Sequence, residues 1–298
     1  MTKIFATLIT FIFVGFVSVW IAGGELSSPV FAKAGLPPSE HSSENVVFEG
    51  VHGWYFPATE HRACILLMHG IRSNRNEMVG RAIFLKDEGY SSLVIDLQAH
   101  GETPGQEITY GYKESNSARS SLKFLRKNKN CGKVIAIGSS LGGAASLLGH
   151  APIEVDGYIL EAVYPSIETA VRNRLKIRFG VAGEMLSPLF YHQIPLRLGV
   201  GLEELQPLNA IRNIKSPVLV MNGTEDQRTT IEEAQLLFNN APHPKVFIKV
   251  EGASHGNLYN YNPMQYKEAI LSFLSKYIDG RTTNKTPAPK KKSAKQIH

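Results

Sequence analysis

The sequence predicts an α/β fold in which a mainly parallel sheet is covered by helices on both faces. Strand-like and helix-like segments alternate from about Val46 to Ile278, and this alternation is typical of a parallel sheet. Some strand-like runs, such as Val134–Ile137, are continuously apolar, as expected of strands buried on both faces. The chain has 298 residues, of which 43% are hydrophobic. That is enough for one domain of about 240 residues with a sizeable core.

The chain begins with an apolar segment that differs from the rest. Lys3 is followed by a run without charges from Ile4 to Ala22. The run is longer than a usual signal-peptide core of about 7 to 15 residues and close to the roughly 20 residues that span a bilayer. A cleavage-like motif, AKA at 32–34, lies far beyond it. We expect residues 1–34 to be either a cleaved export signal or a retained membrane anchor with the folded domain outside the cytoplasm, and we favour the anchor. A buried core helix is the alternative.

The elements of the folded domain follow from the pattern of apolar residues. Continuous apolar, β-branched runs predict strands, and the amphipathic segments between them predict helices. Strands are expected at Ile65–Met68, Val134–Ile137, Pro217–Met221 and Lys245–Val250, and helices at Arg75–Glu88, Lys113–Lys127, Ser140–Gly149, Thr229–Asn240 and Pro263–Ile278.

Ser140 stands at a predicted sharp turn between a buried strand and a helix. The apolar run at 134–137 is followed by GSSLG at 138–142, which has the form G-x-S-x-G, and then by a segment rich in Ala and Leu. In such a nucleophile elbow the serine takes a strained conformation, and glycine neighbours avoid collisions with the strand and the helix. Choosing Ser139 instead would put bulky residues at the two glycine positions. Ser140 is therefore the predicted nucleophile.

A candidate acid and base follow the serine in the order Asp, then His. Asp226 lies in the turn after the strand at 217–221, and His255 follows the strand at 245–250. Both fall at the carboxyl ends of predicted parallel strands, where open α/β sheets gather their sites. Each residue also has a simpler interpretation: His255 as a turn histidine, and Asp226 as the N-cap of the helix at 229–240.

Other carboxylates and histidines compete for these roles. Glu225 is the nearest alternative acid, and Glu161 is a more distant one. His69 and His100 lie too early in the chain for the base in the expected order Ser, Asp, His. We expect these two histidines to fix loops, with both ring nitrogens of each hydrogen-bonded.

Two backbone N–H groups are expected to form an oxyanion hole. The strand at 65–68 ends in His69-Gly70, where a turn would let the N–H of Ile71 face the nucleophile. The N–H of Leu141 begins the helix after the serine and points to the same place. Removing one such donor typically costs about 3 kcal/mol of transition-state stabilisation.

With these motifs, the stretch from about Asn45 to Gly280 resembles the α/β-hydrolase superfamily, and within it serine hydrolases of the aminopeptidase-like or esterase-like kind. Supporting features are His69-Gly70, DLQAHG at 96–101 and LEA at 160–162. Family members usually carry Arg-Gly or a similar pair before the second His-Gly, where this chain has Gln98-Ala99. The resemblance implies the α/β-hydrolase fold, with a mainly parallel, doubly covered sheet.

The predicted chemistry is acyl transfer to water through an acyl-serine intermediate. The expected substrate is a small molecule with a carboxylic ester, thioester or small amide bond. The alternative is a catalytically silent α/β-hydrolase that acts as a binding module at the cell envelope. No metal or organic cofactor is expected, because the two cysteines are far apart in the chain and no His-x-x-x-His pair occurs.

The long segment between the predicted sixth and seventh strands, about 166–216, is expected to form a small helical cap, because it exceeds what one crossover helix needs. Its apolar side chains would line a pocket above the serine; they are Val171, Leu175, Phe179, Met185, Leu189, Phe190, Tyr191, Ile194 and Leu196. The cap also carries Arg172, Arg174, Arg178 and Arg197. These arginines indicate either a site for an anionic end of the substrate or a solvated helical face with snorkelling side chains, and we favour the second.

The positive charge of the chain is concentrated at its carboxyl end. The formal net charge is +6, but residues 281–298 carry six basic and no acidic side chains, whereas residues 35–280 carry 24 basic and 25 acidic ones. The nearly neutral body argues against a nucleic-acid partner. The tail has almost no apolar residues and two prolines, so we expect it to be disordered and solvated. Weak attraction to anionic membranes is the alternative.

The only two cysteines, Cys64 and Cys131, precede strands that are neighbours in the sheet that the resemblance implies. Parallel neighbours lie about 4.8 Å apart, within the Cα separation of roughly 4.4 to 6.8 Å that a disulfide needs. Cys64 is five residues before His69 and Cys131 is seven before Gly138. The resulting offset of about 6 to 7 Å would have to be absorbed by the bend at 130–132. A disulfide, which an exported enzyme could form in an oxidising compartment, and a pair of buried thiols both stay open.

Overall fold

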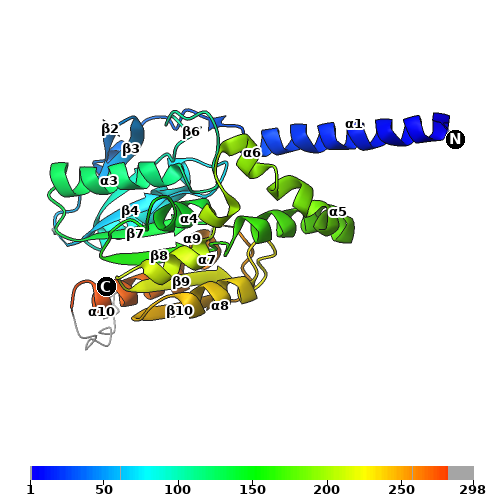
Figure 1. The fold of residues 1–298 in the computed structure, drawn as a ribbon. Helices are drawn as coiled ribbons and strands as arrows, with labels where there is room; N and C mark the ends of the chain where they lie inside the picture. The colour runs from blue at the N-terminus through cyan, green and yellow to red at the C-terminus, as the bar shows by residue number, and fades with distance from the viewer. Residues whose placement is uncertain (1, 61, 257, 281–298) are drawn as a thin grey trace, which may run out of the picture.

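The computed structural model describes residues 2–60, 62–256 and 258–280 (Figure 1). The basic tail predicted at 281–298 lies outside these residues. Within them, the sheet and its covering helices form the body of the molecule, and one long helix, α1 (Thr2–Ser27), extends from it.

Eight strands of the described chain form one sheet, and most of them are parallel. The strands are β2 (Glu44–Phe48), β3 (Val51–Phe56), β4 (Cys64–Met68), β5 (Ser91–Ile95), β7 (Val134–Ser139), β8 (Gly157–Glu161), β9 (Val218–Gly223) and β10 (Lys245–Val250). Their order is β10-β9-β8-β7-β4-β5-β3-β2. All neighbours from β10 to β5 pair in parallel, and β3 and β2 add an antiparallel edge. The predicted mainly parallel α/β sheet is confirmed.

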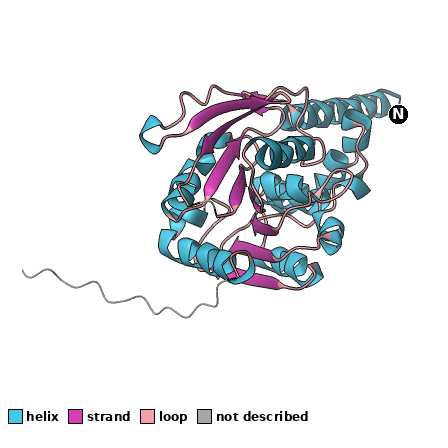
Figure 2. Cartoon of the chain, turned by 90° about the vertical axis from the view of Figure 1, so that its left-hand side faces the viewer, coloured by secondary structure: helices cyan, strands magenta, loops and turns pink. Residues whose placement is uncertain are grey.

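The central strands are apolar throughout because helices cover the sheet on both faces (Figure 2). In β4, Leu66 and Met68 belong to the core on one face, whereas Ile65 and Leu67 belong to the core on the other. Burying one such side chain contributes about 1.5 to 3 kcal/mol. One face is covered by α3 (Glu114–Asn128), α4 (Leu141–Leu147) and α8 (Ile231–Asn240), and the other by α2 (Val79–Asp87) and α10 (Pro263–Tyr277).

The segment between β8 and β9 is helical, as expected of a cap. It holds α5 (Ile167–Tyr191), α6 (Ile194–Leu198) and α7 (Pro207–Ala210), with short 3-10 turns η3 (Leu202–Glu204) and η4 (Ile211–Asn213). The side chain of Ser166 caps α5 by accepting the N–H of Thr169 at 3.2 Å. Gly180, with φ 60° and ψ −146°, interrupts the helical geometry of α5.

Short elements complete the described chain. They are η1 (Ser39–His41), η2 (Arg75–Met78), α9 (Leu258–Tyr261) and a separate parallel pair, β1 (Val30–Phe31) with β6 (His100–Gly101). The helix predicted at 75–88 is therefore divided into η2 and α2.

The carboxyl-terminal end of α1 is attached to the body. The guanidinium of Arg197 lies 4.2 Å from the ring centroid of Trp20, and the N–H of Ile108 donates to the carbonyl of Ser27 at 2.7 Å. Of the helices in the described part of the chain, none combines the length and the apolar character that a membrane crossing needs. The membrane anchor predicted for residues 1–34 is therefore not supported.

Cys64 and Cys131 form a disulfide with a Cα–Cα distance of 5.8 Å. Cys64 pairs with Val134 across β4 and β7, so the register leaves Cys131 three residues before its level. Asn130, with φ 52°, reverses the chain after α3, and the N–H of Cys131 donates back to the carbonyl of Leu125 at 3.1 Å. The reversal at the predicted bend brings the two sulfur atoms together.

Candidate active site

Ser140 occupies a strained turn between β7 and α4. Its backbone has φ 47° and ψ −104°, a conformation that costs a non-glycine residue about 1 to 3 kcal/mol. The N–H of Ser140 donates to the carbonyl of Glu161 on the neighbouring strand at 2.7 Å, which holds the turn in place. The side chain is almost buried, and its Oγ has no hydrogen-bond partner among the described residues.

The glycines on either side of Ser140 are required by close backbone contacts. A Cβ atom on Gly138 would lie 2.3 Å from the backbone nitrogen of Gly143, and one on Gly142 would lie 2.3 Å from the carbonyl oxygen of Met68. Real Cβ contacts are never this short, so strand, turn and helix pack this closely only without side chains here. This packing accounts for the G-x-S-x-G spacing.

Asp226 and His255 meet in space although they follow different strands. His255 Nδ1 lies 2.8 Å from Asp226 Oδ2, and the Asp226 side chain is fully buried. The other carboxylate oxygen accepts the N–H groups of Arg228 at 2.8 Å and Thr229 at 2.9 Å. An ionised carboxylate only accepts hydrogen bonds, so the proton lies on Nδ1 and the lone pair of Nε2 is free. The N-cap of α8 is Thr230, not Asp226.

The two competing carboxylates are placed elsewhere. Glu225 is exposed on the same turn. The carboxylate of Glu161 is buried in an ion pair with Arg81 at 2.5 Å and also accepts the hydroxyl of Tyr266. Sequence reasoning missed the contact that Glu161 does make with the serine, which is through its backbone carbonyl.

The two residues predicted to supply the oxyanion donors share a cavity with the serine. Ile71, Leu141 and Ser140 line the same cavity. Leu141 is the first residue of α4, so its N–H is among those that a helix leaves without an internal partner. The loop that carries Ile71 is held at its start, where the N–H of Gly70 donates to Glu77 Oε2 at 3.2 Å.

His69 follows β4 and His100 begins β6; both are buried, and their rings meet edge to face with centroids 5.1 Å apart. His69 Nδ1 lies 2.7 Å from the carbonyl of Gly70, and its Nε2 accepts the N–H of Leu97 at 3.1 Å. Burial lowers the pKa of His69 and lowers that of His100 to about 4. His100 departs from our expectation, because only Nδ1 is bonded, to Gln98, while Nε2 has no partner within the described residues.

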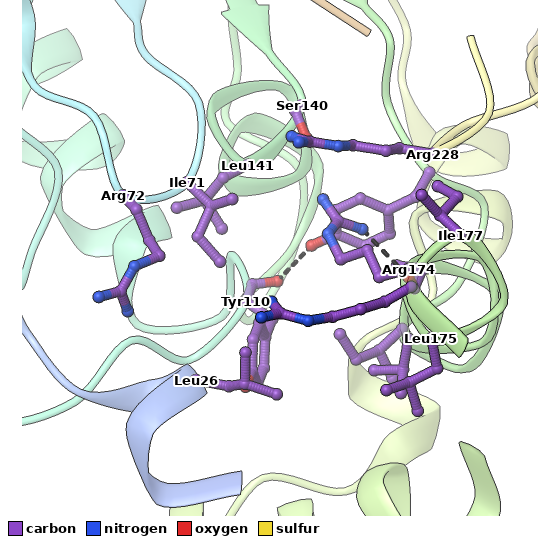
Figure 3. Close-up of a pocket in the computed structure, with 15 residues that line it drawn as sticks. Leu26, Ile71, Arg72, Tyr110, Ser140, Leu141, Arg174, Leu175, Ile177 and Arg228 are labelled. Atoms are coloured by element: carbon purple, nitrogen blue, oxygen red, sulfur yellow. Dashed lines mark hydrogen bonds between the residues drawn. The ribbon is translucent and has the colours of Figure 1, made fainter. Parts of the chain in front are cut away.

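A cavity of about 720 Å³ opens in front of Ser140 (Figure 3). Its walls come from distant parts of the chain: Figure 3 shows residues of α5 on one side and the loop after β4 on the other, with Leu26 of α1 and Tyr110 at the end away from the serine. The hydroxyl of Tyr164 donates to the carbonyl of Tyr110 at 2.7 Å. Leu26, Tyr110, Tyr164, Arg72 and Arg228 had no periodic signal in the sequence, because they come from helix ends, loops and turns.

The cap supplies fewer apolar lining residues than its composition predicts. Val171 and Leu175 line the cavity, whereas Phe179, Met185, Leu189 and Leu196 are exposed by 41% to 81%. The interruption of α5 at Gly180 explains why these later cap residues do not line the cavity, because the face of α5 that meets the cavity does not continue past it. In the described parts of the chain, no group of three or more His, Cys, Asp or Glu side chains could hold a metal ion.

A sequence model of the alpha/beta hydrolase family matches residues 51–269. The chain belongs to this family. The match spans the sheet from β3 and includes Ser140, Asp226, His255, Ile71 and Leu141. The protein is therefore a hydrolase by family, on an α/β-hydrolase fold.

Known proteins similar to this hydrolase agree with the fold. The uncharacterized protein YqkD of Bacillus subtilis is 25% identical over 234 residues, covering 77% of this chain and 76% of its own. The esterase Pf2001 of Pyrococcus furiosus superposes with a TM-score of 0.67 at 21% identity, covering 85% of this chain and 98% of its own. An acylaminoacyl peptidase of Pyrococcus horikoshii superposes with a TM-score of 0.61 at 14% identity, over 82% of this chain and 43% of its own.

Proposed function

We propose that this protein is a serine hydrolase that cleaves a carboxylic ester, thioester or small amide through an acyl-serine intermediate. Ser140 Oγ attacks the substrate carbonyl carbon while His255 Nε2 takes its proton. The N–H groups of Ile71 and Leu141 stabilise the resulting oxyanion. The C–O, C–S or C–N bond then breaks, and the leaving group takes the proton from the imidazolium. Water repeats the sequence on the acyl-serine and releases the acid.

The His255–Asp226 hydrogen bond at 2.8 Å carries this proposal. It joins two residues that are 29 positions apart in the chain, on the loops after β9 and β10. The bond fixes the tautomer that leaves Nε2 as a base, and the two backbone donors to Asp226 Oδ1 fix the carboxylate. The strained serine elbow lies on a third loop at the same end of the sheet.

A substrate panel tests the reaction class. p-Nitrophenyl esters of increasing chain length and aminoacyl p-nitroanilides are assayed with the wild type, with Ser140→Ala and with Ser146→Ala. Ser146 is a matched control because its Oγ is also buried but donates to the carbonyl of Gly143 within α4. Turnover should disappear in Ser140→Ala alone. A folded wild type with no turnover of any member would favour the catalytically silent binding module instead.

The acid is tested by a pair of carboxylate variants. Asp226→Asn should lower kcat by about 10⁴-fold, because the amide no longer holds the productive imidazole tautomer. Glu161→Gln should lower kcat far less when the rate is expressed per folded molecule, because the Glu161 carboxylate forms an ion pair with Arg81. The opposite ranking would assign the acid to Glu161.

We also propose that the hydrolase domain works outside the cytoplasm. The buried disulfide supports this location, because such bridges persist in oxidising compartments. Thiol titration of denatured, unreduced protein from its native compartment should find no free thiol. Two free thiols per chain would contradict the location.

A further inference from the structure

The cavity beside Ser140 is lined mainly by apolar side chains and, besides the serine and two tyrosines, by arginines. Among the described residues, 15 line it, including four arginines and no acidic residue. The arginines are Arg72, Arg174, Arg178 and Arg228. None of them forms an ion pair with a carboxylate in the described part of the chain. The lining therefore carries an uncompensated positive charge.

Two of these arginines lie on the face of α5 that meets the cavity. The α5 residues in the lining, at 167, 170, 171, 174, 175, 177 and 178, recur at helical spacing, so they form one stripe. Arg174 and Arg178 occupy that stripe among apolar residues, whereas Arg172 does not line the cavity and is exposed. Our favoured interpretation, a solvated face with snorkelling side chains, fits the exposed Arg172 and Arg178 but not Arg174, which is half-buried in the cavity lining.

Arg174 is the least exposed of the four arginines that line the cavity. It is half-buried, whereas Arg72, Arg178 and Arg228 are exposed. Its Nη1 donates to the carbonyl of Ala170 at 3.1 Å, in its own helix. Burial lowers the pKa of Arg174, and the nearby charge of Arg228 lowers it further.

The groups around Arg174 do not neutralise it. Burial raises the pKa of Tyr110 to about 12, and burial also raises the pKa of Tyr164 above its ordinary value. Both phenols are therefore uncharged at neutral pH. The carboxylate of Asp226 attracts Arg174 but is already bonded to His255 and to two backbone N–H groups. A desolvated cation without a counter-ion is costly. A bound anion would remove that cost.

We infer that the substrate is an acyl compound whose apolar chain ends in an anionic oxygen group, a carboxylate or a phosphate, which Arg174 and Arg228 bind. This inference rests on the proposed function. The apolar chain of the substrate would contact the apolar residues of the lining, which include Leu26, Ile71, Val171 and Leu175. Both kinds of anion match the two-donor edge of a guanidinium. The exposed Arg72 and Arg178, which also line the cavity, add a positive field that draws such a substrate in.

Matched substrates test the inference. The values of kcat/KM are compared for p-nitrophenyl hexanoate, the mono-p-nitrophenyl ester of adipic acid, and p-nitrophenyl hexanoate with a terminal phosphate. The wild type should prefer at least one anionic ester over the neutral one. Arg174→Gln should lower kcat/KM for that ester about 10- to 100-fold, as expected for loss of a charged hydrogen bond, and change the neutral ester less than about threefold. Arg228→Gln should act in the same direction, whereas Arg172→Gln is the matched control on the same helix. The preferred anion distinguishes carboxylate from phosphate.

A binding measurement keeps this test separate from that of the proposed function. Adipate and inorganic phosphate are titrated calorimetrically into full-length Ser140→Ala, which cannot turn over. Binding of either anion that is lost in Ser140→Ala/Arg174→Gln supports the inference, even if no ester is cleaved. Equal kcat/KM values for neutral and anionic esters in the wild type, with no anion binding, would overturn it and leave the serine hydrolase intact.

Discussion

Opening the Cys64–Cys131 disulfide should remove a large part of the stability of the folded protein. The two cysteines are separated by 67 residues. In the chain-entropy treatment, a loop of this size restricts the unfolded chain by about 15 cal/mol/K, which is about 4 kcal/mol at 25 °C. Because single domains are stable by about 5 to 15 kcal/mol in all, the bridge is a major contribution. The melting temperature should fall by about 8 to 16 °C.

Urea unfolding measures this contribution. The oxidised wild type is compared with the reduced wild type and with Cys64→Ala/Cys131→Ala, each followed by circular dichroism. The reduced wild type is the matched control, because it keeps both buried side chains and loses only the bond. Identical midpoints for oxidised and reduced protein would refute the reasoning. So would two titratable thiols in oxidised protein after denaturation.

Three further predictions concern buried groups around the site. Burial lowers the pKa of His100 to about 4 from 6.5, so below pH 6.5 the unfolded chain binds a proton that the folded chain does not. The free energy of unfolding should therefore fall by up to about 3 kcal/mol between pH 6.5 and 4. His100→Asn should flatten that part of the plot of unfolding free energy against pH. Glu161→Gln should lower the free energy of unfolding by about 3 to 5 kcal/mol, because it leaves Arg81 buried without a counter-ion; a loss below 1 kcal/mol would contradict the ion pair's role. Gly142→Ala should destabilise by about 1 to 3 kcal/mol or prevent folding, because its Cβ meets a backbone oxygen of β4, whereas Gly132→Ala, with open space around it, should melt like the wild type.

The local features of the fold could be predicted from the sequence. Continuous apolar runs predicted β4, β7 and β9, because these strands are buried on both faces and need no polar side. The edge strand β10 was also predicted, although it is only partly buried and carries two lysines. The turn at Ser140 was predictable because the close contacts that require glycine at 138 and 142 fall within five consecutive residues, so they leave a local sequence pattern. The loops holding Asp226 and His255 were predictable because parallel strands bring their carboxyl ends together.

Features that depend on how distant segments meet could not be predicted. The register of β4 and β7 pairs Met68 with Gly138, so the cysteine offset is three residues and not the two expected from His69. The contact between the Ser140 N–H and the Glu161 carbonyl has no signature in side-chain type. Leu26 reaches the cavity only because α1 lies against the cap, which periodicity within α1 does not reveal.

The identity of the acylated residue tests the central claim most directly. The wild-type protein is treated with a fluorophosphonate probe, digested, and mapped by mass spectrometry. We predict one modification per chain, on Ser140, absent after heat denaturation and absent in Ser140→Ala but retained in Ser146→Ala. Modification of Ser139 or of any other serine, or persistent labelling of Ser140→Ala, would contradict the assignment of Ser140 as the nucleophile.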